Sequence, residues 1–329
     1  MVRCVLSMGL TYDRVMVTGG AGFIGSHTVD ALLQNGQRVW VLDDLSSGSL
    51  QNLNRWKKDS RLHFKRGDIA RYKVVASLAG KVEAIVHLAA LVSPNVSIQR
   101  PELAHQINVS GTMNVLRAGV RHRIQRTVFA SSSSVYGNAE SVKISEDAKL
   151  DPVTPYGASK LAAEKYCRAF HESYGLETIS LRYFNVYGAR QSSNPYSGVI
   201  AIFTKRLLRG LAPTIYGDGR QTRDFVHVSD VVNANLLALK ATKGVGDALN
   251  IGTGRATTIM QLYRMLTQLR GREDIFPTFA RARAGDIGAS CADIANARAT
   301  IGFKPKVPLR SGLQLLIESL NSKPFSRSN

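Results

Sequence analysis

The sequence predicts an α/β protein with a doubly wound parallel sheet and a smaller second domain. Short apolar segments alternate with helical segments over the first 188 residues. This alternation is typical of parallel strands joined by right-handed crossovers. After Gly188, loops rich in glycine, serine, proline and asparagine separate short elements. This change indicates a smaller domain over the carboxyl ends of the strands, where α/β folds bind ligands.

The expected elements of the first part follow in chain order. Strands are expected at residues 14–18, 37–42, 62–65, 84–88, 127–130 and 178–183. Helices are expected at residues 22–34, 101–120 and 155–174, and the last two start with a proline, which is favoured in the first turn. We expect a disordered leader (1–13), a first domain (14–188), a second domain (189–321) with some segments returning to the first, and a tail (322–329).

The composition limits the classes of protein. The chain has 43 Lys and Arg against 24 Asp and Glu, a net charge of +19. The basic residues are dispersed and no nucleic-acid motif accompanies them, so a generally basic surface is favoured over a nucleic-acid partner. No apolar run approaches the roughly 20 residues that span a bilayer. Cys4, Cys167 and Cys291 are scattered, which favours a reducing, cytoplasmic compartment and gives no metal spacing.

A glycine-rich turn follows the first strand and opens a helix. Gly19, Gly22 and Gly25 allow a tight turn, close approach of a diphosphate and close packing of helix on strand. The helix N-terminus stabilises phosphate charge. Asp43 stands 18 residues after Gly25, at the end of the second strand. A carboxylate there can accept both ribose hydroxyls and repels a 2′-phosphate, so the sequence predicts a dinucleotide site with NAD rather than NADP.

Tyr156 and Lys160 stand four residues apart on a predicted helix, so their side chains project from one face. We expect the ammonium group to lower the pKa of the phenol toward neutrality. Such a tyrosine can take a proton from an alcohol while hydride leaves the same carbon. His87 is expected to make a structural hydrogen bond. Asn108 is expected to be exposed, and the alternative is an inward amide that braces the active-site strand.

Several motifs occur in a fixed order: GGAGFIG, Asp43, HLAA, a serine–VYG turn, PYGASK and RYFN. With these motifs the chain resembles the extended short-chain dehydrogenases/reductases, and most the NAD-dependent nucleotide-sugar epimerases related to UDP-glucose 4-epimerase. The resemblance covers about residues 14–320. It implies a Rossmann domain, a C-terminal nucleotide-sugar domain, tightly held NAD and a homodimer formed through helices near 101–120 and 155–174.

The resemblance also assigns site residues. It implies a catalytic set of Ser132, Tyr156 and Lys160. It implies NAD contacts from Gly19, Gly22, Phe23, Ile24, Asp43, Asp68, Ile69, Leu88, Ala89, Tyr156, Lys160 and Tyr183. It implies UDP-sugar contacts from Ser132, Asn185, Tyr216, Arg223, Arg283 and Ser290, with the two arginines on the diphosphate and Tyr216 near the uracil.

The serines after Ser132 discriminate among reactions of a 4-keto sugar. Related 4,6-dehydratases carry Asp-Glu at the positions of Ser133 and Ser134, and related decarboxylases carry a glutamate at the second. Hydroxyl groups cannot replace these acids and bases, so simple 4-epimerisation is favoured. Small Ser290 at a pocket-narrowing position leaves room for an N-acetyl group.

Three alternatives stay open at this stage. The first is UDP-glucuronate 4-epimerase, against which Asn185 counts because some uronate epimerases have threonine there. The second is an NAD(P)-dependent reductase that releases its product and so needs exchangeable cofactor. The third is a basic NAD-binding module without activity.

Overall fold

A seven-stranded parallel sheet forms the centre of the protein. The computed structural model describes residues 11–139, 143–191, 198–282 and 288–321. The strand order is β11-β6-β5-β4-β1-β2-β3, and neighbouring strands are parallel throughout. The strands are β1 (Arg14–Thr18), β2 (Arg38–Asp43), β3 (Leu62–Arg66), β4 (Ala84–His87), β5 (Arg126–Ser132), β6 (Glu177–Tyr183) and β11 (Ala248–Ile251). The order reverses between β1 and β4, so a ligand-binding crevice is expected at their carboxyl ends.

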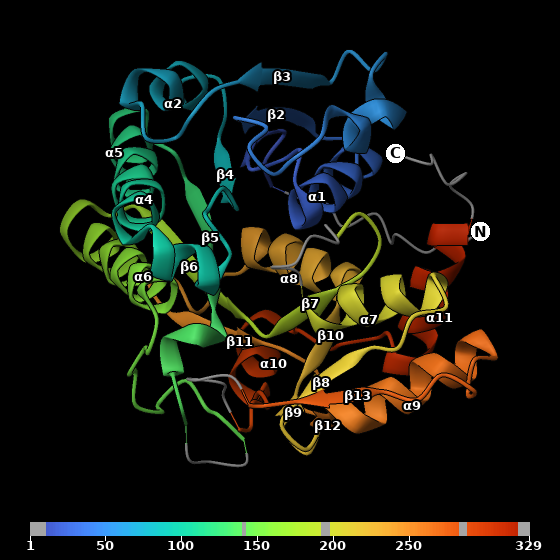
Figure 1. The fold of residues 1–329 in the computed structure, drawn as a ribbon. Helices are drawn as coiled ribbons and strands as arrows, with labels where there is room; N and C mark the ends of the chain where they lie inside the picture. The colour runs from blue at the N-terminus through green and yellow to red at the C-terminus, as the bar shows by residue number, and fades with distance from the viewer. Residues whose placement is uncertain (1–10, 140–142, 192–197, 283–287, 322–329) are drawn as a thin grey trace.

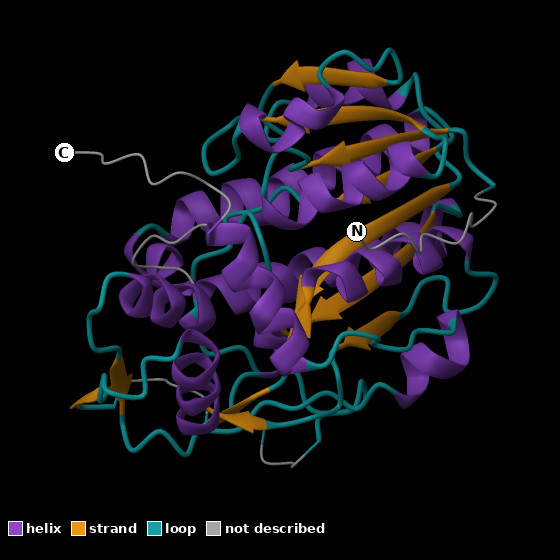
Figure 2. Ribbon diagram, turned by 90° about the vertical axis from the view of Figure 1, so that its right-hand side faces the viewer, coloured by secondary structure: helices purple, strands orange, loops and turns teal. Residues whose placement is uncertain are grey.

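Helices cover both faces of this sheet (Figures 1 and 2). One face carries α1 (Phe23–Gln34) and α8 (Val228–Lys240), and the other carries α2 (Tyr72–Ala79), α5 (Thr112–Arg121) and α6 (Pro155–Tyr174). Strand side chains alternate between the two cores: Val15 and Val17 of β1 join the first, and Met16 joins the second. Both faces of the central strands are therefore buried, which explains why β1 and β4 are mainly apolar, whereas the edge strand β3 is largely exposed.

The second half of the chain builds its own core and also returns to the sheet. Its short strand pairs are β7 (Asn185–Tyr187) with β10 (Phe225–His227), β8 (Thr214–Tyr216) with β13 (Thr278–Ala280), and β9 (Thr222–Arg223) with β12 (Thr257–Thr258). Its helices are α7 (Val199–Leu208), α9 (Ile259–Arg270), α10 (Ala295–Ile301) and α11 (Leu309–Asn321). Buried side chains of α7, α9 and α11 form a separate cluster. In contrast, α8 and β11 belong to the first sheet and its core.

Short helices lie between the main elements. They are η1 (Leu50–Trp56), α3 (Pro94–Gln99), α4 (Pro101–His105), η2 (Gln106–Gly111) and η3 (Ser133–Tyr136). The expected helix 101–120 is therefore interrupted, because η2 is a π-helix between α4 and α5. The expectation of an exposed Asn108 is wrong: the residue is 1% exposed. The wider π-turn directs Asn108 inward, where the backbone of Leu91 satisfies both ends of its amide.

The remaining boundaries shift by one or two residues, as expected for fraying ends. Residues 1–10 and 322–329 lie outside the described residues. The predicted disordered leader (1–13) is too long, because Tyr12 is 7% exposed and packs in the core beside β1. In the described part of the chain, no helix is long and apolar enough to cross a bilayer, and no group of three or more His, Cys, Asp or Glu is arranged to hold a metal ion.

Candidate active site

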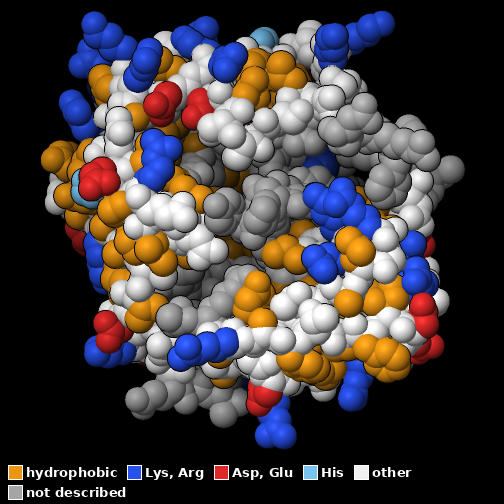
Figure 3. Space-filling view, in the orientation of Figure 1, with side chains coloured by type: hydrophobic (Ala, Val, Ile, Leu, Met, Phe, Trp, Pro, Cys, Tyr) orange, Lys and Arg blue, Asp and Glu red, His pale blue; other side chains and the backbone are white. Residues whose placement is uncertain are grey.

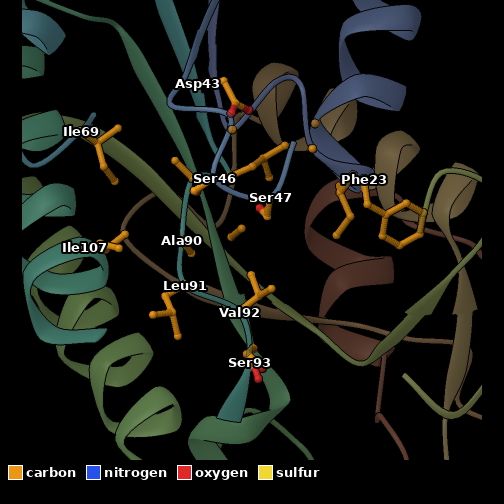
Figure 4. Close-up of a pocket in the computed structure, with 18 of the residues that line it drawn as sticks. Phe23, Asp43, Ser46, Ser47, Ile69, Ala90, Leu91, Val92, Ser93 and Ile107 are labelled. Atoms are coloured by element: carbon orange, nitrogen blue, oxygen red, sulfur yellow. The ribbon is translucent and has the colours of Figure 1, made fainter. Parts of the chain in front are cut away.

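A cavity of about 670 Å³ lies at the carboxyl ends of the central strands. Its wall comes from the turn after β1, the ends of β2, β4, β5 and β6, and the first turn of α6. Figure 4 shows Asp43, Ser46 and Ser47 toward one end, and Phe23 across the cavity from Ile69 and Ile107. The segment 90–93 runs between these two sides. The cavity therefore occupies the crevice that the strand order predicts.

The glycine-rich turn has no room for side chains. Gly19 adopts φ +68°, and a Cβ atom there would lie 2.8 Å from the amide nitrogen of Ala89. A Cβ atom on Gly25 would lie 2.0 Å from the carbonyl oxygen of Gly19. The turn thus brings the N-terminus of α1 to the cavity, where Gly19, Gly22, Phe23 and Ile24 form part of the wall. Backbone N–H groups at such a terminus suit a diphosphate.

Asp43 ends β2 with its carboxylate held in place. One oxygen accepts a hydrogen bond from the Ala21 amide at 2.9 Å and the other from the Leu45 amide at 2.8 Å. Burial raises the pKa of Asp43, and these two hydrogen bonds oppose the shift. Each oxygen keeps a second lone pair for a ribose hydroxyl. The neighbouring wall contains Asp68, Ile69, Leu88 and Ala89, as well as Tyr183. The residues present thus fit the adenosine and diphosphate parts of NAD.

Tyr156 and Ser132 meet at the other end of the cavity. Tyr156 lies in the first turn of α6, which begins at Pro155 with Thr154 as its N-cap. Its side chain is 8% exposed and lines the cavity together with Ser132, the last residue of β5, whose hydroxyl donates to the Ser134 hydroxyl at 3.1 Å. The amide of Ser134 donates to the Ser132 hydroxyl oxygen at 3.1 Å, which holds the serine at the strand end. A tyrosine and a serine hydroxyl on the wall of one cavity can move a proton to or from a substrate alcohol.

The expectation that the Lys160 ammonium group lowers the pKa of Tyr156 is wrong. The ammonium group donates to the Ala130 carbonyl oxygen at 2.8 Å and lies 4.9 Å from the centre of the Phe129 ring. Burial lowers the pKa of Lys160 to about 7. Burial also raises the pKa of Tyr156, and only the nearby Ser132 hydroxyl acts in the other direction. In the protein alone, desolvation of the phenolate therefore outweighs the effect of the neighbouring lysine.

His87 makes the structural hydrogen bonds expected of it. Its Nδ1 lies 2.6 Å from the Thr18 hydroxyl and its Nε2 lies 3.0 Å from the Thr112 hydroxyl. The Thr18 oxygen also accepts from the amides of Leu88 and Ala89. It therefore donates to Nδ1, which makes His87 a neutral Nε2–H tautomer. Burial lowers the pKa of His87 to about 3, in agreement with a neutral ring.

Asn108 links the cavity wall to the catalytic helix. Its amide exchanges hydrogen bonds with the backbone of Leu91 at 2.8 and 3.0 Å and donates to the Ser159 hydroxyl at 2.9 Å. Ser159 in turn donates to the Tyr156 carbonyl oxygen. The amide thus braces both the segment after β4 and the first turn of α6.

A buried ion pair behind the site was not predicted from the sequence. Glu164 lies one turn after Lys160 on α6 and accepts hydrogen bonds from Arg182 Nε at 3.0 Å and from the Ser131 hydroxyl at 2.8 Å. The side chains of Glu164 and Arg182 are 6% and 5% exposed. This pair joins α6 to the ends of β5 and β6. No local pattern indicates this pair, because Glu164 and Arg182 lie 18 residues apart in the chain.

Of the predicted UDP-sugar contacts, Ser132 lines this cavity, whereas the other described ones are not among its wall residues. Asn185, in β7, lies between Phe184 and Val186, which do line it. Arg223, in β9, donates to the carbonyl oxygen of Thr222, which also accepts a hydrogen bond from the Ser290 amide. Tyr216 ends β8 and is 36% exposed. Arg283 lies outside the described residues.

Some wall residues had no motif to point to them. They are Ser46, Ser47 and Asn52 after β2, and Arg190 and Gln191 after β7. Asn52 donates to the Ala21 carbonyl oxygen at 2.8 Å, which ties η1 to the glycine-rich turn.

The surface carries dispersed charge, as the composition predicts. On the face shown in Figure 3, Lys and Arg side chains are spread widely, with Asp and Glu between them.

The comparisons with known proteins now identify the family. The model of the NAD dependent epimerase/dehydratase family matches residues 15–252. The chain belongs to this family. The UDP-glucose 4-epimerase of Mycolicibacterium smegmatis is 38% identical over 94% of this chain and 99% of that protein. The family's requirement for NAD agrees with the glycine-rich turn and Asp43, so NAD is the cofactor.

Two solved structures extend the likeness. The UDP-glucose 4-epimerase of Thermotoga maritima with UDP-glucose matches with a TM-score of 0.89 and 39% identity, over 94% of this chain and 98% of that one. The UDP-N-acetylglucosamine 4-epimerase of Methanobrevibacter ruminantium with UDP-N-acetylmuramic acid matches with a TM-score of 0.90 and 36% identity, over the same shares. The chain is therefore a UDP-glucose 4-epimerase-like member of the extended short-chain dehydrogenases.

Proposed function

We propose that this protein is an NAD-dependent 4-epimerase of UDP-sugars, acting on UDP-glucose and UDP-galactose and on UDP-N-acetylglucosamine and UDP-N-acetylgalactosamine. One observation carries the proposal. Ser132 and Tyr156 line the same cavity as the glycine-rich turn and Asp43. A proton-transfer pair therefore shares one space with the residues that fit NAD.

The position of the carboxylates in the cavity wall supports epimerisation over elimination. Among the described residues that line the cavity, the carboxylates are Asp43 at the end of β2, Asp44 directly after it, and Asp68 after β3. Two strands separate β2 from β5, so these groups are about 14 Å or more from Ser132 at ordinary strand spacing. Elimination of water needs a further acid and base close to the sugar. The positions after Ser132 carry only the hydroxyls of Ser133 and Ser134.

The proposed reaction is redox-neutral. Bound NAD supplies the acceptor that takes hydride from C4 of the sugar and the donor that returns it. Tyr156 takes the C4 hydroxyl proton, directly or through Ser132, and a 4-keto sugar forms. The keto sugar turns over in the pocket, and Tyr156 returns the proton to the oxygen as hydride arrives on the opposite face. The protonated, positively charged form of Lys160 stabilises the Tyr156 phenolate.

The second domain, residues 189–321, is proposed to hold the nucleotide sugar. Arginine forks suit a diphosphate, and Arg223 and Arg283 are proposed for that role, with Asn185 beside the sugar and Tyr216 near the uracil. Ser290 is 6% exposed, and its amide donates a hydrogen bond to the carbonyl oxygen of Thr222, the residue before Arg223. The segment that carries Ser290 therefore lies beside Arg223. This proximity supports a pocket with space for an N-acetyl group.

A homodimer is proposed through the surface of α6 and the helices before it. Tyr166 and Tyr174 of α6 are 40% and 62% exposed, and Ile98 of α3 is 59% exposed. They stand on neighbouring elements, since α3 and α4 both contact α6. Light scattering during gel filtration should give twice the chain mass. The chain mass itself would overturn this part of the proposal.

The function is tested by incubating the purified protein, without added NAD, with UDP-glucose, UDP-N-acetylglucosamine or UDP-glucuronate. We expect each of the first two to approach an equilibrium mixture with its 4-epimer. Turnover of UDP-glucuronate alone would replace the proposal with uronate epimerisation. A strict requirement for added cofactor, with one equivalent of NAD(P)H used per product, would replace it with a reductase.

A further inference from the structure

Arg190 enters the cofactor cavity from the second half of the chain. It follows β7 and forms part of the cavity wall together with Phe23 and Ile24 of α1. Its backbone adopts φ +67°, in the left-handed region that residues other than glycine rarely occupy. Such strained positions persist where the surroundings hold them, and they cluster at ligand-binding sites. Neighbouring residues must therefore hold Arg190 in this conformation.

Two residues of α1 hold this segment. Asp30 accepts from Nη2 of Arg190 at 2.7 Å, and His27, one turn earlier, donates from Nε2 to the Ala189 carbonyl oxygen at 2.9 Å. The other carboxylate oxygen of Asp30, Oδ1, accepts a hydrogen bond from the indole N–H of Trp56 at 2.7 Å. The Arg190 and Asp30 side chains are 22% and 13% exposed. One end of the guanidinium group is thus fixed against α1.

The other end of the guanidinium group is unpaired. Nη1 of Arg190 is buried and has no hydrogen-bond partner among the described residues. Oε1 of the neighbouring Gln191 is likewise buried and unpaired, while its Nε2 donates to the Val186 carbonyl oxygen. Buried polar atoms without partners cost free energy and are rare. Both residues belong to the same wall, which indicates that a bound molecule supplies an acceptor for Nη1 and a donor for Oε1.

The chemistry of that molecule follows from its position. An arginine that lines a cavity and has one unpaired end of its guanidinium group suits an anionic oxygen. Arg190 is anchored on the helix whose N-terminus, at Gly22 and Phe23, forms the diphosphate-binding turn. We propose that Arg190 binds the diphosphate of NAD through Nη1 while Asp30 holds Nη2, and that this contact slows release of the cofactor. The hydroxyl of a ribose is the corresponding donor for Gln191. The inference concerns NAD alone and does not depend on which sugar is the substrate.

The test measures release of NAD from the purified holoenzyme after transfer to cofactor-free buffer. Arg190→Gln should release NAD about tenfold faster or more, since hydrogen bonds to charged groups carry roughly this weight and usually act on dissociation. Arg38→Gln is the matched control: its side chain is 59% exposed and pairs with Asp13 at 3.5 Å, and release should not change. Unchanged release in Arg190→Gln would overturn the proposal.

Two further variants separate the contact from the ion pair. Asp30→Asn removes the ion pair and keeps the guanidinium group, so it should speed NAD release less than Arg190→Gln does. Equal effects would assign both to the ion pair and overturn the proposal. Arg190→Lys keeps the positive charge, but its single ammonium group must serve both Asp30 and the diphosphate. Release of NAD should therefore be about threefold faster or more. Wild-type release in this variant would contradict the need for a forked side chain.

The diphosphate of the nucleotide sugar is the other source of anionic oxygen. Calorimetric titration of the holoenzymes with UDP should give the same affinity for Arg190→Gln as for the wild type. Weaker UDP binding with unchanged NAD release would place Arg190 on the substrate and overturn the proposal. Failure of UDP to bind to either protein would count against the proposed function only, because the NAD measurement does not require it.

Discussion

The buried pair of Glu164 and Arg182 gives a quantitative test of how the site is held together. Glu164 accepts three hydrogen bonds: Nη2 and Nε of Arg182 at 2.5 and 3.0 Å, and the Ser131 hydroxyl at 2.8 Å. Arg182 also donates to the Tyr136 hydroxyl at 2.7 Å. In Glu164→Gln the arginine keeps its charge but loses its counter-ion. Removing one partner of a buried pair costs about 3–5 kcal/mol, so we expect a loss of at least about 3 kcal/mol in the free energy of unfolding.

The chain offers a matched control. Glu177 pairs with the buried Arg126, but its own side chain is 48% exposed. Arg126 also donates to the carbonyl oxygens of Ala238 and Ala241. Glu177→Gln should therefore cost only about 0–1 kcal/mol. Urea unfolding with the same excess of NAD gives both values. Equal losses in the two variants, or a loss under about 1 kcal/mol in Glu164→Gln, would refute the argument that uncompensated burial decides the cost.

Three further predictions concern the catalytic set and the sugar pocket. Tyr156→Phe should lose all measurable epimerisation while retaining bound NAD and the wild-type circular dichroism spectrum; activity in this variant would refute the role of the phenol. Because the pKa of Lys160 is lowered to about 7 from 10.5, the unfolded state binds more protons between these values, and stability should rise with pH across this window. Lys160→Met removes this titration, so the stability of the variant relative to the wild type should improve as the pH falls from about 10 to about 7, measured by urea midpoints. A constant difference would contradict the lowered pKa. Ser290→Tyr should depress turnover of UDP-N-acetylglucosamine at least about tenfold while sparing UDP-glucose; equal losses on both would refute the pocket assignment.

Local patterns predicted most of the frame. The parallel strands, the helix at 155–174 and the glycine-rich turn depend on residues close together in the chain, because hydrophobic alternation and steric limits act over a few residues. The spacing of Tyr156 and Lys160 likewise follows from one helical turn. The sequence by itself thus determined the fold class, the type of cofactor and the location of the candidate proton-transfer pair.

Tertiary structure decided what surrounds these groups. Desolvation raises the pKa of Tyr156, although its spacing from Lys160 indicated the opposite, because burial depends on the whole fold. Asn108 turns inward through a π-helix that no periodicity indicated. Arg190 reaches Asp30 across 160 residues of chain. Such contacts join segments with no local relation, and only the packed fold determines which charges lose their water and which find a partner.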